Sequence, residues 1–375
     1  MQIFLHVLAF ITGLSIVILT LSSAISTFVL PRAARSQLNR IVFGLLRRTF
    51  NFILHFAKTY PRRDGIMAYY APIAIMMLVP TWYVLISLGY AAMYWSLGVG
   101  NFSTDLRLSG LSVLTLGFES PKTSFLTVLI FSEAMIGLIL VALLIAYLPT
   151  MYAAFSRREQ VVNMLEVRAG SPPSAVEMLL RFHRNQGLEK LSEYWSVWEA
   201  WFADLEESHT TLPALVFFRS PRAENSWITA TGAVLDAAAL TLSTIEIPYA
   251  ISAALSIRAG FLALHRIADY FDIPHPHEPH YPAVPICVER AEYDEVVNKL
   301  VDAGIPIKAD REQAWRDFAG WRVNYDRALI LLCGLVMAPQ APWSGDRAPK
   351  FNLPPIMLLK KHKMLMKHEH LLEEE

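Results

Sequence analysis

The stretch LSVLTLGFESP, from Leu111 to Pro121, places a short polar step with a glycine between two long apolar runs. Backbone that leaves helical geometry inside a lipid bilayer loses hydrogen bonds that water cannot replace there. Such a stretch therefore survives at membrane depth only where it is buried in protein or lines water. The fold depends on whether both apolar runs cross a membrane, and the function depends on what the step between them serves.

Three segments of the chain carry no Asp, Glu, Lys or Arg: residues 1–31, 65–104 and 134–156. Each is longer than the roughly 20 residues that a helix needs to cross the hydrocarbon core. Of all 375 residues, 54% are hydrophobic and only 18% are charged, which also indicates an integral membrane protein. The net charge is zero, so nothing favours nucleic acid as a partner.

The charges between these segments predict an orientation. The linker 32–64 carries eight basic residues, Arg32, Arg35, Arg40, Arg47, Arg48, Lys58, Arg62 and Arg63, against one acid, Asp64. By the positive-inside rule the linker is expected to be cytoplasmic and the N-terminus to lie outside. The expected membrane is the plasma membrane, and its lipid is an expected partner. The first segment lacks the basic start of a signal peptide and is expected as an uncleaved helix over 1–31. The linker helix is amphipathic, which fits either the lipid headgroups or packing against protein.

The C-terminal half reads as a cytoplasmic, all-helical domain over 174–340, joined by a linker at 157–173 and followed by a charged tail at 341–375. Ser174 with Glu177 forms the S-x-x-E signature of a helix start. The apolar run 227–263 is interrupted by charges, so a buried helical pair is favoured over a fourth span. The predicted fold class is an all-α membrane protein with three transmembrane helices, a re-entrant pore loop and a cytoplasmic all-helical domain.

Residues 65–156 meet the physical requirements of a pore module. The stretch Ser103–Leu114 predicts a short helix, capped by Ser103 or Thr104, whose negative C-terminal dipole end would face a cation. Thr115 then supplies a hydroxyl, and Gly117 permits unusual backbone angles. Downstream, Gly137 and Pro149 are candidate flexible points of the last span and hence candidate gating residues.

Thr115, Leu116, Gly117 and Phe118 resemble the first four positions of the Thr-Val-Gly-Tyr-Gly filter of two-helix potassium channels. The resemblance extends over residues 73–159 in the same order of elements. It implies a homotetramer that conducts potassium ions through backbone carbonyls, without a cofactor and without enzymatic activity.

Glu119 departs from that pattern, because it stands where the family has its second glycine. Four copies of Glu119 would form an acidic ring at the outer mouth, and such rings concentrate cations. A non-selective cation channel and a non-conducting sensor or scaffold therefore remain as alternatives to a potassium-selective channel.

Four further polar residues or stretches are candidates for a functional role. Glu133 lies within the third span and is either a functional acid or one half of a pair behind the filter. The stretch HPHEPH, 275–280, is expected as a surface loop and not a metal site, because its prolines favour an extended chain. Cys287 and Cys333 are expected as free thiols. The chain lacks a P-loop and a dinucleotide fingerprint, so the regulatory ligand of the helical domain is not identified.

Overall fold

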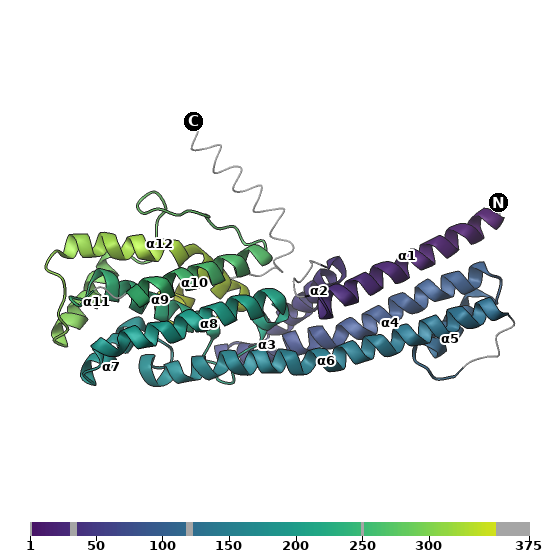
Figure 1. Ribbon diagram of the computed structural model, residues 1–375, viewed down its shortest axis with the longest axis horizontal. Coiled ribbons are helices and arrows are strands. Elements are labelled where there is room, and N and C mark those ends of the chain that lie inside the picture. Colours follow the sequence, from purple (N-terminus) through teal and green to yellow (C-terminus); the bar gives the residue numbers. More distant parts are fainter. Residues whose placement is uncertain (1, 31–35, 118–122, 249–250, 350–375) are drawn as a thin grey trace, which may run out of the picture. The chain divides into compact units, whose positions relative to one another are not determined.

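A computed structural model describes residues 2–30, 36–117, 123–248 and 251–349 (Figure 1). Within these residues the regular structure is helical, and one isolated β-bridge joins Ile245 to Ile307. The helices are α1 (Gln2–Phe28), α2 (Gln37–Leu54), α3 (Tyr60–Ala68), α4 (Tyr70–Ser96), α5 (Phe102–Val113), α6 (Ser124–Ala169), α7 (Ala175–Arg184), α8 (Leu191–Thr211), α9 (Trp227–Ser243), α10 (Ile251–Tyr270), α11 (Arg290–Asp302) and α12 (Arg311–Val336), with short 3₁₀ turns η1 (Leu188–Lys190), η2 (Pro213–Phe217) and η3 (Gly345–Arg347).

The chain divides into two compact units, which are described separately. The first unit comprises Met1–Leu46 and Tyr69–Ala153, and the second comprises Arg47–Ala68 and Ala154–Glu375. The all-helical class expected from the sequence is confirmed for the described residues.

Four helical stretches in the described parts of the chain are long and apolar enough to cross a membrane. They are Gln2–Phe28, Tyr60–Ser96, Ser124–Ala169 and Ile251–Tyr270. The first three overlap the three spans expected from the sequence. The fourth, α10, packs against α8, α9 and α12 in the second unit, and every residue of α9 is buried. This packing agrees with the buried helical pair expected over 227–263.

In the first unit, α1 and α4 lie side by side and cross where two glycines meet (Figure 1). A Cβ atom at Gly89 would lie 2.8 Å from the carbonyl oxygen of Gly13, and a Cβ at Gly13 would overlap the carbonyl of Gly89. Small residues that bring two backbones together are the usual basis of helix packing in membranes, where lipid is as apolar as the side chains.

The apolar surface of α6 has two faces. One face is buried at 126, 130, 133, 137, 140 and 147, a spacing of three and four residues that follows one side of a helix. The other face exposes large apolar side chains: Phe125, Val128, Phe131, Met135, Leu138, Ile139 and Ile145. A contiguous apolar face of this kind requires lipid or another protein surface against it.

Helix α6 is longer than the span expected from the sequence. It continues without interruption to Ala169, so residues 157–169 of the expected linker are helical. Arg158 fixes this extension within the second unit, because its buried guanidinium donates to the carbonyl oxygens of Leu215 at 2.9 Å and Phe218 at 2.8 Å. The same guanidinium forms an ion pair with Glu159 at 2.8 Å.

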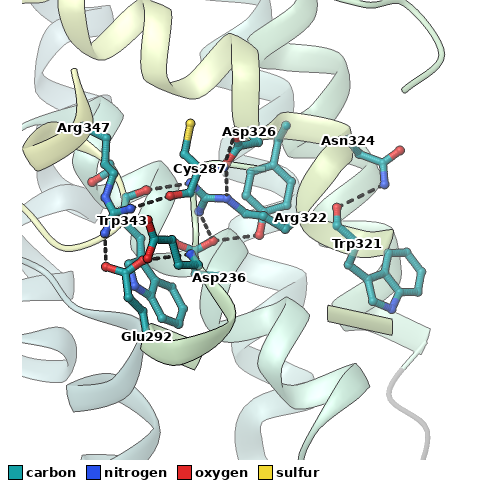
Figure 2. A network of polar contacts seen from close by, with 12 residues as sticks. Asp236, Cys287, Glu292, Trp321, Arg322, Asn324, Asp326, Trp343 and Arg347 are labelled. Atoms are coloured by element: carbon teal, nitrogen blue, oxygen red, sulfur yellow. Dashed lines mark hydrogen bonds and ion pairs between the residues drawn. The ribbon is translucent and has the colours of Figure 1, made fainter. Parts of the chain in front are cut away.

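The second unit has a large aromatic and aliphatic core, with a charged network inside it (Figure 2). Arg322 of α12 is fully buried and donates to Asp236 of α9, to Asp326 at 2.7 Å and to the carbonyl oxygen of Trp343 at 2.6 Å. The hydroxyl of Tyr325 donates to Asp236 at 2.9 Å. One guanidinium thereby joins α9, α12 and the segment around Trp343.

Residues 341–349, expected as the start of a charged tail, belong to this fold. Trp343 is buried, and Arg347 donates to the carbonyl oxygen of Cys287 and forms an ion pair with Glu292 of α11 (Figure 2). The tail that remains, 350–375, lies outside the described residues. Cys287 and Cys333 are both free thiols, as the sequence predicts.

Part of the basic linker also belongs to the second unit. The side chain of Arg47 is buried and donates to the carbonyl oxygen of Leu335 at 3.1 Å. Asp64 forms an ion pair with Arg219 at 3.0 Å, and the hydroxyl of Tyr60 donates to the carbonyl of Met337 at 3.2 Å. At Arg47, Tyr60 and Asp64 the linker packs against protein, whereas Phe52 and Phe56 on the same stretch are exposed.

Candidate functional site

The short helix between the two long helices is present as α5. It starts at Phe102, because the side chain of the preceding residue, Asn101, accepts a hydrogen bond from the Thr104 amide at 2.9 Å. Asn101 is thus the N-cap, and the expectation of Ser103 or Thr104 in that role was wrong. Asp105 follows in the first turn and is fully buried. The positive end of the helix dipole stabilises a carboxylate at this position.

Beyond α5 the backbone turns sharply. Thr115 has φ of 54° and Gly117 has φ of 128°, whereas Leu116 between them is not among the residues with positive φ. A β-branched residue such as Thr rarely adopts positive φ. The amides of Thr115 and Leu116 donate to the carbonyl oxygens of Ser112 at 3.0 Å and Leu111 at 2.9 Å, which is the pattern of a helix C-terminus that ends in a left-handed residue. Phe118 and Glu119, the other two predicted filter residues, lie outside the described residues.

The side chains of this turn are exposed in the single chain. Leu116 is 69% exposed and Leu114 49% exposed, although both are large and apolar. A Cβ atom at Gly117 would meet nothing within 4 Å, so the demand for glycine there comes from its backbone angle and not from crowding.

Gly137 lies against the end of α5. A Cβ atom at this position would overlap the carbonyl oxygen of Val113, the last residue of α5. The hydroxyl of Tyr83 of α4 donates to the carbonyl of Gly137 at 2.8 Å. Of the two roles that a glycine has here, hinge or packing point, the described contacts support close packing. Pro149 lies twelve residues further along, within the unbroken α6.

Glu133 occupies the centre of the first unit and is fully buried. One carboxylate oxygen accepts a hydrogen bond from the hydroxyl of Tyr94 of α4 at 2.7 Å, and the other accepts from Ser109 of α5. Ser109 also lies 3.0 Å from the carbonyl oxygen of Ser87. The acid therefore joins α4, α5 and α6 one turn before Gly137, directly behind the end of the short helix.

The structure brings some of the predicted residues together and leaves others apart. Thr115, Leu116 and Gly117 follow one another at the end of α5, and Gly137 packs against that same end. The sequence did not single out Tyr94 or Ser109, the two partners of Glu133. Nothing in the sequence around Ser109 indicates that it binds Glu133. An acid within an apolar span nevertheless requires hydrogen-bond donors, so a hydroxyl group on each neighbouring helix is to be expected.

No family model, curated protein or solved structure that was compared with the chain matches it. The chemistry of the site therefore carries the functional argument by itself.

Proposed function

We propose that the chain is one subunit of a tetrameric cation channel, in which carbonyl oxygens near Thr115 to Gly117 receive a partly dehydrated cation. The observation that carries the proposal is the strained, non-helical turn at the C-terminal end of a short helix, between two helices of membrane length. In an extended stretch with negative φ throughout, successive carbonyls point in opposite directions, whereas positive φ at alternate residues turns them toward one side. Rings of such carbonyls replace the water around an ion.

The electrostatics of α5 support the same function. The last carbonyl groups of a helix carry the negative end of its dipole, and they end at Val113 and Leu114, directly before the turn. A cation next to them gains a favourable interaction without any charged side chain.

The exposed apolar side chains support assembly with further copies, and the number four is what the resemblance to potassium channels implies. One chain leaves the apolar side chains of Leu114 and Leu116 and one whole face of α6 uncovered. Closed rotational symmetry is the usual way for a soluble or membrane protein to cover such faces and to enclose an axis. In this proposal potassium is the preferred ion, and Glu119 supplies an acidic ring at the outer mouth.

A flux assay in liposomes with opposed potassium and sodium gradients tests the proposal. Gly117→Ala is expected to reduce the current at least about tenfold, because alanine disfavours the φ of 128° by more than 1 kcal/mol. Gly110→Ala is the matched control. Gly110 lies within α5 with nothing within 4 Å of its Cβ position, so the same added methyl group is expected to leave the current unchanged.

The reversal potential then decides the ion. A current that reverses near the potassium potential supports a selective filter, and a reversal near zero supports a non-selective cation pore. A protein that forms stable dimers in nanodiscs and passes no current with either glycine variant would instead be a membrane scaffold, and the channel proposal would be abandoned.

A further inference from the structure

The loop after α10 folds back on the end of that helix and gathers three potential metal ligands. They are Asp269 of α10 and His275 and His277 of the HPHEPH stretch, and their ligand atoms all lie within 4.8 Å of one another. Nε2 of His275 lies 3.6 Å from a carboxylate oxygen of Asp269, beyond hydrogen-bond distance. The imidazole rings of His275 and His277 have centroids 5.3 Å apart.

His275 is the residue that points to a ligand. Its side chain is only 2% exposed, yet its buried Nε2 atom has no hydrogen-bond partner. Its other ring nitrogen, Nδ1, lies 2.9 Å from the carbonyl oxygen of Ile273. A carbonyl only accepts, so Nδ1 carries the proton, and in the neutral ring Nε2 presents a lone pair toward Asp269 and His277. A hydrogen bond from the second nitrogen to a carbonyl is the arrangement that orients a metal-binding histidine.

A second histidine fixes the position of the first. The ring of His265 packs edge to face against His275, with centroids 4.3 Å apart. Nε2 of His265 lies 2.9 Å from the carbonyl oxygen of Asn324 of α12, which holds this ring in turn. His275 is therefore set in place by its neighbours before any ligand arrives, which lowers the ordering cost of binding.

We propose that Asp269, His275 and His277 form a binding site for a transition-metal ion of the zinc type. Zinc ligands lie about 2.0–2.2 Å from the metal, and tetrahedral angles then separate neighbouring ligand atoms by about 3.4 Å. The 3.6 Å between His275 and Asp269 is close to that value. His277 is exposed, and its ligand atom lies within 4.8 Å of the other two, so it must move closer to them when a metal binds.

The donor set also selects the class of metal. Two imidazole nitrogens and one carboxylate oxygen suit zinc and its neighbours in the first transition row, whereas magnesium and calcium require oxygen ligands. Three protein ligands leave a fourth position open. The prolines around the histidines made the sequence favour an ordinary loop, yet the ligand atoms of His275 and His277 lie within 4.8 Å of each other.

The site lies entirely within the second unit and does not depend on the proposed pore. Its test uses the full chain, purified without a polyhistidine tag, stripped with a chelator and titrated with zinc chloride in a calorimeter. The wild-type chain is expected to bind one zinc ion, and millimolar magnesium or calcium is expected not to compete. His277→Ala is expected to weaken zinc binding at least about tenfold, because one of three ligands is lost.

His280→Ala is the matched control, because His280 is an exposed residue of the same stretch that is not part of the cluster. It is expected to leave zinc affinity within about twofold, since no ligand or outer partner is changed. His277 is exposed, so its truncation does not disturb the core, and unchanged circular dichroism of the stripped variant verifies this. Cobalt substitution gives a second readout, the visible absorption of a tetrahedral site, which His277→Ala is expected to abolish.

Two outcomes would overturn the proposal. The first is a wild-type chain that binds zinc no more tightly than the double variant His275→Ala, His277→Ala. The second is an equal loss of affinity in His280→Ala and His277→Ala, which would mean that zinc binds loosely to the histidine-rich stretch as a whole.

Discussion

The two units of this chain hold their helices together by different means. In the first unit, helices meet at glycines, and one of the buried acids, Glu133, joins three of them through neutral hydroxyl groups. In the second unit the buried contacts include full charges of both signs, with Arg158 and Arg322 each serving several partners.

The difference is what lipid around the first unit and water around the second would produce. A helix in lipid gains little from burying apolar side chains, so close backbone contact and a few hydrogen bonds must hold the bundle. A unit covered by water gains from apolar burial, and it accommodates buried charges where each one is paired and hydrogen-bonded. The exposed apolar face of α6 and the enclosed aromatic core of the second unit are two results of the same rule.

The largest expected effect is the loss of the charged network. Arg322→Met removes the cation and leaves Asp236 and Asp326 buried without it, which is expected to destabilise the second unit by about 3–5 kcal/mol. Arg316→Met, on the same helix but 63% exposed, is expected to cost less than about 1 kcal/mol. Urea denaturation followed by tryptophan fluorescence measures both. Equal midpoints for the two variants would show that the network adds nothing to stability.

Disrupting a glycine contact in the first unit is expected to destabilise the protein less than the loss of Arg322 does, but by a measurable amount. Gly137→Ala places a methyl group on the carbonyl of Val113 and is expected to destabilise this unit by about 1–3 kcal/mol through overpacking. Gly110→Ala again serves as the control, because its methyl group meets open space. Reversible unfolding in sodium dodecyl sulfate compares them. If Gly137→Ala were as stable as the control yet altered channel opening, Gly137 would act as a hinge and not as a packing point.

The smallest expected effect is a dependence on pH in the second unit. Burial and the neighbouring Arg158 lower the pKa of His209 well below its usual value of 6.5. The guanidinium of Arg158 only donates, so Nε2 of His209, 3.2 Å away, accepts and the folded ring is neutral. Below pH 6.5 the histidine of the unfolded chain binds a proton that the same histidine in the folded chain does not bind. The free energy of unfolding therefore falls as the pH falls.

Between pH 7.5 and pH 6 this loss is expected to be about 0.8 kcal/mol, because the unfolded histidine titrates near 6.5. Urea midpoints at the two pH values measure it. His209→Gln is expected to reduce the difference, since glutamine keeps a polar side chain but does not titrate. A difference that stays the same in His209→Gln would assign the dependence to other groups.

Local patterns predicted much of the fold. Apolar runs located the long helices, and Ser174 was confirmed as the N-cap of α7, with its side chain 3.5 Å from the Glu177 amide. Local patterns failed at ends and junctions. Asn101 and Ser103 are both acceptable caps, and only the path of the preceding chain decides between them. The end of α6 was missed because its charged continuation past Arg157 does not resemble the apolar span before it.

Contacts between distant residues could not be predicted in this way. Asp236 and Arg322 are 86 positions apart, and each by itself is typical of a solvent-exposed charge. Trp343 and Arg347 follow a proline-rich stretch that reads as a tail, and their burial depends on partners in α11 and α12. At the proposed pore, the sequence predicted the order of residues but not that the end of α5 packs on Gly137.

The two cysteines have a practical consequence for mapping the turn after α5. Both belong to the second unit, where Cys333 is buried and Cys287 is half-buried. Burial and the nearby carboxylate of Asp326 raise the pKa of Cys287 to about 11, and burial raises the pKa of Cys333 as well. The thiolate is the nucleophile that attacks thiol reagents, so at neutral pH the natural chain is almost inert toward them. A cysteine introduced at the exposed position of Leu116 would then be the main reactive thiol, and charged reagents added from one side at a time would report which face of the membrane this turn meets.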